Sequence, residues 1–199
     1  MDLIASIARD SLGVIDNWLS DQELARISRA FDQWIIDKQF TPAKIGKAEN
    51  QLLNTEIRGD ETWWFDPLDP PSELLSTLKR IDELRVQINR ELFLGLKDWE
   101  AHLAIYPAGA GYKKHLDRHR DSSHRKLSLI LYLNENWSPE LGGELVIYRK
   151  THEEMMRITP MGGRLVVFLS EDFPHEVLPA KRARRSLTGW FLDAARGVV

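Results

Sequence analysis

The sequence contains no cysteine, and this absence excludes several kinds of site. Without thiols the chain has no disulfide framework, cysteine nucleophile or cysteine-ligated zinc or iron–sulfur centre. It lacks an apolar run of the roughly 20 residues that a membrane span needs, and it lacks the basic start and clean apolar stretch of a signal peptide. The net charge of -3 comes without an extended basic stripe, so we expect neither nucleic acid nor a membrane as a partner. A cytoplasmic protein is therefore expected.

The remaining composition is that of an ordinary globular protein, with 43% hydrophobic and 29% charged residues, and it predicts a single domain over residues 1–199. Up to about residue 97 the pattern is mainly helical. Ser20 and Glu23 form a capping-box pattern, and apolar residues follow it at helical spacing: Leu24, Ile27, Phe31, Trp34 and Ile35. A second helix is predicted after Pro70–Pro71, with an apolar stripe of Leu75, Leu78, Ile81, Leu84, Ile88 and Leu92. Between these helices, the mixed segment 46–64 is a candidate substrate loop.

From residue 98 onward, short apolar runs alternate with glycine, proline and asparagine. Six strands are expected, at 101–106, 126–134, 143–148, 164–169, 175–179 and 186–192. Many short strands in succession are typical of an antiparallel sandwich or jelly roll. The predicted fold is α+β, with a double-stranded β-helix (jelly-roll) core over 98–199 and the N-terminal helices packed on one sheet. Residues 1–97 then provide helical support and the candidate substrate loop.

The stretch YKKHLDRHRDSSH, residues 112–124, contains two His-x-Asp pairs, His115/Asp117 and His119/Asp121. On a strand, residues i and i+2 point to the same side, so either pair aims an imidazole and a carboxylate at one point. A further histidine from a neighbouring strand would complete the 2-His-1-carboxylate set of non-haem Fe(II) oxygenases, and His175, at the start of a predicted strand, suits this role. Spacing alone does not choose between the pairs. A solvated histidine-rich loop or a fortuitous zinc or nickel site is the alternative.

A second group of residues indicates an anion-binding pocket. Arg184, Ser186, Thr188 and Trp190 share one strand parity and so face the same side. Because a buried, unpaired charge is costly, an inward arginine beside a metal needs an anionic partner, and arginine grips a carboxylate with two hydrogen bonds. Tyr132 lies on the strand face opposite to Leu127, Leu129, Leu131 and Leu133. A metal, an arginine and a tyrosine together describe a site for a small dicarboxylate.

Four segments, YPAGAGYKKHLD, LILYLNENW, GGELVIY and HEVLPAKRARRSLTGWF, resemble the catalytic core of Fe(II)/2-oxoglutarate-dependent oxygenases of the prolyl 4-hydroxylase type. Within that family they are most similar to the prolyl hydroxylases that modify hypoxia-inducible factor and to their bacterial relatives. The resemblance covers about the last hundred residues and extends weakly to TEIRGDETWWF. The family frame is Y-x-x-H-x-D, which Tyr112 begins here. The resemblance therefore implies three iron ligands, His115, Asp117 and His175, and leaves His119 and His124 as exposed loop residues.

The resemblance also implies further roles. Arg184, helped by Tyr132, would bind the distal carboxylate of 2-oxoglutarate, and Tyr106 would lie near the end that chelates iron. Ser186 would add a hydrogen bond to the cosubstrate, while Thr188 and Trp190 would line the pocket. The catalytic set is then His115, Asp117, His175 and Arg184. Arginine in this position, where the collagen-type branch has lysine, favours the factor-modifying branch.

The implied reaction is hydroxylation of a prolyl residue in a protein or peptide, with oxidative decarboxylation of 2-oxoglutarate to succinate and CO2. It requires Fe(II), 2-oxoglutarate and O2, with ascorbate as a candidate reductant. Transcription and translation factors are candidate substrates, and the Trp63–Trp64 pair is a candidate surface for stacking on a proline, although paired tryptophans are more often core residues. Two alternatives stay open: the same chemistry on a small molecule or another residue type, and a non-enzymatic jelly roll that binds a metal or oxoglutarate.

Overall fold

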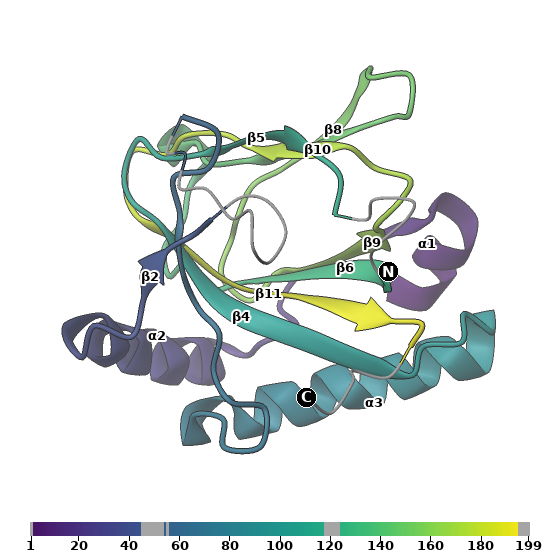
Figure 1. Cartoon of the computed structure of the whole chain (residues 1–199), viewed down its shortest axis with the longest axis horizontal. Coiled ribbons are helices and arrows are strands. Elements are labelled where there is room, and N and C mark those ends of the chain that lie inside the picture. Colours follow the sequence, from purple (N-terminus) through teal and green to yellow (C-terminus); the bar gives the residue numbers. More distant parts are fainter. Residues whose placement is uncertain (1, 45–53, 55, 118–123, 195–199) are drawn as a thin grey trace.

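The computed structural model describes residues 2–44, 54, 56–117 and 124–194. Two antiparallel sheets lie face to face (Figure 1). The seven-stranded sheet has the order β1 (Leu12–Ile15), β9 (Leu165–Leu169), β6 (Arg125–Tyr132), β11 (Arg184–Leu192), β4 (Asp98–Tyr106), β3 (Glu61–Trp63) and β2 (Thr41–Pro42). The four-stranded sheet has the order β5 (Tyr112–His115), β10 (His175–Val177), β7 (Leu145–Tyr148) and β8 (Glu154–Ile158).

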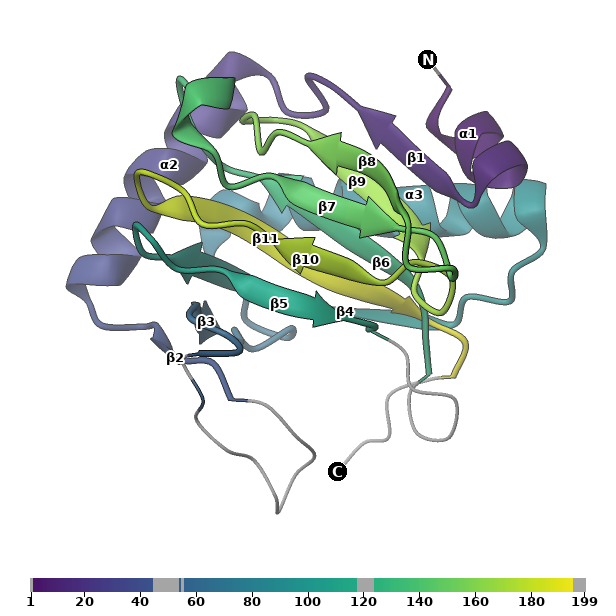
Figure 2. The same ribbon diagram turned by 90° about the horizontal axis from the view of Figure 1, so that it is seen from above.

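In the described part of the chain, the α-helices pack against the seven-stranded sheet. α2 (Asp21–Ile36) and α3 (Leu75–Leu92) lie on its far side from the four-stranded sheet (Figure 1). α1 (Leu3–Asp10) lies beside the sheet next to β1, and its Leu3, Ile4 and Ile7 join the same hydrophobic core as the buried residues of α2 and α3. Seen from above, the strands of the two sheets run in similar directions, as in aligned sheet packing (Figure 2). The predicted jelly-roll core with helices on one sheet is thus confirmed. Among the described residues, no helix is long and apolar enough to cross a membrane.

The two long helices form for the reasons that the sequence suggests. Ser20 accepts a hydrogen bond from the Glu23 backbone N–H, and the Glu23 carboxylate accepts one from the Ser20 backbone, so the capping box begins α2. A short 3-10 turn, Ser72–Leu74, precedes α3. The predicted apolar stripes are largely buried, but two positions were wrong: Ile35 and Leu75 are exposed. Each lies within a turn of one end of its helix.

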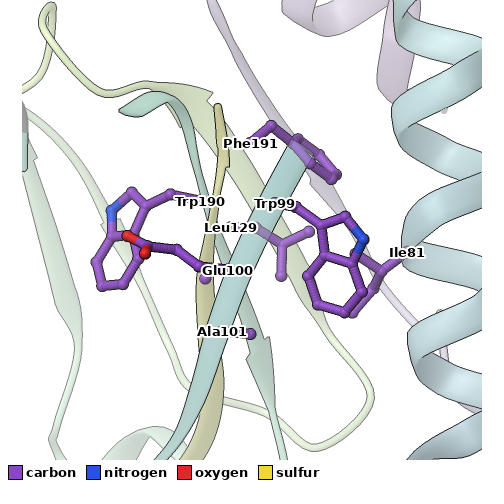
Figure 3. A pocket seen from close by; sticks show the side chains of 8 residues that line it. Ile81, Trp99, Glu100, Ala101, Leu129, Trp190 and Phe191 are labelled. Atoms are coloured by element: carbon purple, nitrogen blue, oxygen red, sulfur yellow. The ribbon is translucent and has the colours of Figure 1, made fainter. Parts of the chain in front are cut away.

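The alternation along the central strands divides the protein into two cores. Four leucines at alternate positions along and just after β6 pack against the helices in the outer core: Leu127, Leu129, Leu131 and Leu133. Ile130 and Tyr132 belong to the inner core between the sheets. The same division is visible on β4 and β11, where Trp99 and Phe191 point toward Ile81 of α3 while Glu100 and Trp190 lie on the opposite side (Figure 3).

Five of the described strands are not among the six expected: β1, β2, β3, β5 and β8. Two of them, β1 and β8, have weak strand patterns in their sequences. β1 is a four-residue strand that follows α1 directly, in a part of the chain expected to be helical. Its Gly13 fits tightly against α1, since a Cβ there would lie 2.6 Å from a methyl carbon of Leu3. β8 is an edge strand with mostly exposed side chains, so it has no apolar run to reveal it. The six expected strands all form, with shifted ends.

A short 3-10 turn, Pro139–Leu141, leads into the pair Gly142–Gly143, and both glycines have positive φ. This conformation is open to glycine at little cost, which explains the tight turn before β7.

Candidate active site

Three residues, from two neighbouring strands and the bend after one of them, converge between the sheets. His115 ends β5 and is the direct cross-strand partner of His175, the first residue of β10. Asp117 lies just beyond β5, with its carboxylate oxygens 3.7 Å from Nε2 of His115 and 3.6 Å from Nε2 of His175. One ligand atom from each of the three lies within 4.8 Å of the others. Two imidazoles and one carboxylate in this arrangement form a 2-His-1-carboxylate set that suits Fe(II).

Both histidines have their second ring nitrogen occupied. Nδ1 of His115 lies 2.8 Å from the carbonyl oxygen of Lys113, and Nδ1 of His175 lies 3.0 Å from that of Phe173. A carbonyl can only accept, so each Nδ1 carries the proton and each Nε2 presents a lone pair to the shared point. The Ser128 hydroxyl donates to Asp117 at 2.7 Å and lies 2.9 Å from the Ser170 hydroxyl. These outer contacts orient all three ligands for a metal.

The expectation that the His-x-Asp pair lies on one strand was wrong, because β5 ends at His115 and Asp117 follows in a bend. A β-bulge also separates the pairs His175–His115 and Val177–Tyr112. Residues three apart on a regular strand face opposite sides, and the extra residue of the bulge cancels this difference. As a result, the rings of Tyr112 and His115 stack at 3.6 Å between centroids. The bulge therefore supports a metal ligand with an aromatic ring.

The electrostatics of this cluster favour the protonation states that a metal requires. Burial lowers the pKa of His115 to about 3, helped by His175 and opposed by Asp117. Burial acts to raise the pKa of Asp117, but His175, His115 and the Ser128 hydroxyl outweigh it and hold this pKa well below its usual range. The Trp190 indole N–H lowers it further, although it meets no acceptor in hydrogen-bonding geometry among the described residues. A neutral His115 and an ionised Asp117 can coordinate a cation without first releasing protons.

Arg184 provides a buried positive charge on the inner face of the larger sheet. It is 2% exposed and pairs across the strands with Tyr106. Its guanidinium carbon lies 5.0 Å from the Tyr106 ring centre and 4.9 Å from that of Tyr132, and Nη2 donates to the Tyr132 hydroxyl at 3.4 Å. No carboxylate pairs with it among the described residues, and its Nε has no partner there. A buried guanidinium of this kind fits a carboxylate of a small ligand.

The other residues expected in the pocket lie in register beside Arg184. Ser186 pairs with Tyr132 and Thr188 with Ile130, and the Ser186 and Thr188 hydroxyls are 3.1 Å apart. Trp190 pairs with Ser128, which binds Asp117. Burial raises the pKa of both Tyr106 and Tyr132, so their phenols stay protonated as donors. Tyr106 lies as close to Arg184 as Tyr132 does, and its expected place near the chelating end stays a prediction.

Several neighbours of the site were not assigned from the sequence. Ser128 lies on the same face of β6 as Tyr132, and this alternation in the sequence was the signal that could have identified it. Arg58 binds Asp60 through two contacts, at 2.6 and 2.9 Å, and covers the Tyr112 ring at 4.8 Å. The backbone at residues 57–58 pairs with the edge of β5, where the Lys113 N–H donates a hydrogen bond to the Ile57 carbonyl. The contacts with Tyr112 and Lys113 join residues about 55 positions apart, so no local sequence pattern predicts them.

The two tryptophans of the candidate loop lie in different surroundings. Trp63 contacts Trp34, Phe40 and Phe65 in the outer core. Trp64 is 51% exposed and lies 4.5 Å from His102 and 6.1 Å from Trp190 between ring centroids. Much of the loop, residues 45–53 and 55, lies outside the described residues, as do His119 and Asp121. His124 is exposed, as expected, with Nδ1 3.2 Å from an Asp193 oxygen.

Comparison with known proteins agrees with this geometry. The family model described as the 2OG-Fe(II) oxygenase superfamily matches residues 101–192. The chain belongs to this superfamily, and the resemblance seen in its motifs is confirmed. Members use Fe(II), 2-oxoglutarate and O2, and the cluster of His115, Asp117 and His175 fits the iron while Arg184 fits a carboxylate of the cosubstrate.

The chain is also similar in sequence to individual prolyl hydroxylases. It is 29% identical to the hypoxia-inducible factor prolyl hydroxylase of Caenorhabditis elegans over 204 residues, covering 96% of this chain and 28% of that protein. It is 27% identical to human Egl nine homolog 1 over 198 residues, covering 96% and 46%. The chain thus spans less than half the length of these two relatives.

The structural matches cover nearly whole chains. A Pseudomonas putida prolyl-4-hydroxylase has a TM-score of 0.84 at 39% identity, covering 97% of this chain and 98% of that one. A Trichoplax adhaerens prolyl hydroxylase, in complex with a peptide fragment of the hypoxia inducible factor oxygen degradation domain, has a TM-score of 0.83 at 25% identity, covering 96% and 87%.

Proposed function

We propose that this protein is an Fe(II)- and 2-oxoglutarate-dependent dioxygenase that hydroxylates a prolyl residue of a protein or peptide. One combination of features carries the proposal. A preoriented 2-His-1-carboxylate set and a buried arginine without an acidic partner among the described residues both face the space between the sheets. The first is suited to Fe(II), and the second to one carboxylate of 2-oxoglutarate.

In this proposal, bound Fe(II) together with 2-oxoglutarate and O2 would supply the chemistry, in which one oxygen atom of O2 enters the prolyl residue and the other enters succinate as CO2 is released. His115 and His175 present Nε2, and Asp117 presents a carboxylate oxygen that Ser128 keeps in place. Arg184 and the Tyr132 hydroxyl bind the distal carboxylate of the cosubstrate. The inner-core side chains around them, among them Ile130 and Phe168, exclude water from the reacting centre.

The remaining pocket residues have supporting roles. Ser186 adds a hydrogen bond to the cosubstrate, while Thr188 and Trp190 line the pocket beside it. Tyr106, protonated because burial raises its pKa, donates a hydrogen bond within the same pocket. These roles are supported by the shared face of β4 and β11, where Tyr106 is the cross-strand partner of Arg184 and the other three side chains follow Arg184 at two-residue spacing.

The substrate assignment rests on the relatives and on the site surface. The Trichoplax adhaerens enzyme binds a peptide fragment, and half-exposed Trp64 offers an apolar ring beside the metal ligands where a prolyl ring can stack. We propose that residues 1–199 act as one domain, because α2 and α3 share the outer core with strands of the 98–199 half. A cytoplasmic location suits a centre that needs reduced iron, and cell fractionation tests it.

An anaerobic spectrum tests the metal and cosubstrate site. Fe(II) and 2-oxoglutarate are added to the metal-free protein, and a weak visible charge-transfer band is expected only when both are present. The band should persist in His119→Ala and in His124→Ala and should disappear in His115→Ala. Loss of the band in His119→Ala instead would assign iron to the other pair, and no band in any protein would refute the oxygenase assignment.

Turnover tests the substrate class. Fe(II), 2-oxoglutarate, O2 and ascorbate are supplied with a library of prolyl peptides, and succinate and a peptide mass gain of one oxygen atom are measured together. Hydroxylated prolyl peptide with matching succinate is the expected result. Succinate formation that only small molecules or non-prolyl peptides stimulate would contradict the prolyl assignment. Binding of 2-oxoglutarate without any succinate would indicate a non-enzymatic binding protein.

A further inference from the structure

Three rings from three different strands or strand ends meet beside the metal ligands, and we call them the three-ring cluster: Trp64, His102 and Trp190. Their centroids are 4.5 Å apart for Trp64 and His102, 5.5 Å for His102 and Trp190, and 6.1 Å for the two indoles. The interplanar angles are 33°, 28° and 15°. Trp190 therefore stacks with both other rings, and Trp64 is tilted against His102, all at centroid distances that favour offset aromatic packing.

The cluster follows from strand register. Thr62 and Trp63 of β3 pair with Ala104 and Leu103 of β4, so the next residue, Trp64, comes beside His102. On the other side of β4, His102 pairs with Thr188 of β11, two residues from Trp190. His102 thus occupies the central strand of the three and connects the end of the candidate substrate loop to the β11 side of the pocket.

His102 is a buried, neutral imidazole, so it is suited to packing against other rings and unsuited to acting as an acid. It is 2% exposed, and burial, with Arg58 and Arg125 nearby, lowers its pKa to about 3 against the opposing effect of Asp117. Its Nδ1 has no hydrogen-bond partner among the described residues. Burying a histidine nitrogen without a hydrogen-bond partner costs free energy. The contacts of the imidazole ring with the two indoles offset part of this cost.

The cluster also leads to the metal site. The Trp190 ring is covered by the Arg125 guanidinium at 3.4 Å, which Glu100 binds at 2.8 Å. Trp190 is also the cross-strand partner of Ser128, whose hydroxyl donates a hydrogen bond to Asp117. Trp190 is therefore fixed within the pocket, whereas Trp64 is half exposed and follows a short three-residue strand near the sheet edge. Trp64 depends on His102 and Trp190 for its orientation.

We propose that His102 is a positioning residue: its imidazole ring holds Trp64 against Trp190 and so fixes the aromatic surface on which a prolyl substrate docks. The proposal rests on the proposed prolyl hydroxylase function and deepens it by assigning the support of the docking surface. It requires the ring of His102 and leaves its unpaired nitrogen without a role in docking.

Two variants separate the ring from the nitrogen. His102→Phe keeps an aromatic ring without a polar atom, and His102→Gln keeps hydrogen-bonding capacity without a ring. His152→Asn is the matched control, because His152 is exposed and its positive φ of 69° is one that asparagine tolerates. All variants are first required to give the Fe(II)–2-oxoglutarate band of wild type, which establishes a folded site.

The first measurement needs no substrate. Acrylamide quenching of tryptophan fluorescence, with the same protein carrying Trp64→Phe as background, reports how well Trp64 is covered. Quenching of Trp64 should rise in His102→Gln and stay at the wild-type level in His102→Phe and His152→Asn. Unchanged quenching in His102→Gln would overturn the proposal, whatever the substrate proves to be.

The second measurement is peptide kinetics. Loss of two aromatic contacts should raise KM for a prolyl peptide roughly tenfold in His102→Gln, with kcat and the affinity for 2-oxoglutarate near wild type. His102→Phe should restore KM. Restoration by glutamine and failure by phenylalanine would show that the nitrogen matters and would refute the proposal. If no prolyl peptide is a substrate of wild type, the proposed function fails, while the quenching result still decides the position of Trp64.

Discussion

Replacing Arg184 with methionine should make the ligand-free protein more stable and nearly abolish its affinity for 2-oxoglutarate. The guanidinium is 2% exposed, has one hydrogen bond of 3.4 Å to a neutral hydroxyl, and has no acidic partner among the described residues. Removing such an ion from water costs several kcal/mol, and contacts with two tyrosine rings return about 0.5–2 kcal/mol each. Methionine fills similar space without a charge, so a gain of about 1–4 kcal/mol in unfolding free energy is expected.

The same substitution removes the anchor for a carboxylate. Two charge-assisted hydrogen bonds contribute about 1.5–3 kcal/mol each, and their loss corresponds to roughly 10²–10⁴-fold weaker binding. Urea denaturation of the metal-free proteins measures the first effect. Calorimetric titration with 2-oxoglutarate in the presence of a redox-inert divalent metal measures the second.

Arg185→Met provides the matched control. Arg185 is the next residue on β11, points to the helix side, binds Asp32 at 2.6 Å and covers the Phe31 ring at 5.0 Å. Loss of this partly exposed pair should cost at most about 1 kcal/mol and leave 2-oxoglutarate binding unchanged. If Arg184→Met proved less stable than wild type and still bound 2-oxoglutarate with near wild-type affinity, the reasoning would be refuted, and Arg184 would be a structural residue.

Three further outcomes are expected. Ser128→Ala removes the 2.7 Å hydrogen bond to Asp117 and should weaken Fe(II) binding roughly 10–100-fold in a metal titration, whereas an unchanged affinity would show that Asp117 needs no such support. Tyr148 donates a hydrogen bond to Glu176, which raises the pKa of Tyr148 to about 12. Because the folded state favours the neutral phenol, this hydrogen bond contributes fully to folding stability below the unfolded pKa of about 10, and its contribution is lost as pH rises through 12. Ultraviolet titration should therefore show tyrosinate earlier in Glu176→Gln than in wild type, and equal curves would contradict the assignment. Ile27→Ala empties a fully buried position of the outer core and should cost about 2–5 kcal/mol in urea denaturation, so a loss below about 1 kcal/mol would show that α2 packs loosely.

The sequence predicts those features that depend on local periodicity. The parity of Arg184 and Ser186 on β11, and of Tyr132 against its leucine neighbours on β6, needs only the two-residue repeat of a strand, and the observed register agrees. The capping box of Ser20 and Glu23 is equally local. Helix ends were less predictable, since Ile35 and Leu75 continue the apolar periodicity of their helices and are nevertheless exposed near the helix ends.

Features that depend on contacts between distant segments were not predictable in this way. The bulge that brings Tyr112 onto His115 arises from pairing with a strand about 60 residues away. The hydroxyl of Ser128 reaches Asp117 only because β6 passes beneath the end of β5. His102 carries no motif, and its position between two indoles follows from the combined register of β3, β4 and β11. Family resemblance selected the metal ligands where spacing had left two pairs open.

The direct pairing of His115 with His175 has a consequence for how the protein reaches its native state. A slip of one residue between β5 and β10 would turn one imidazole out of the space between the sheets, because neighbouring side chains on a strand face opposite sides. A misregistered chain would then offer an incomplete ligand set and bind metal weakly. Iron would bind preferentially to chains whose smaller sheet has closed correctly, and by mass action it would enrich them. Metal availability during synthesis would therefore influence the yield of correctly assembled protein as well as its activity.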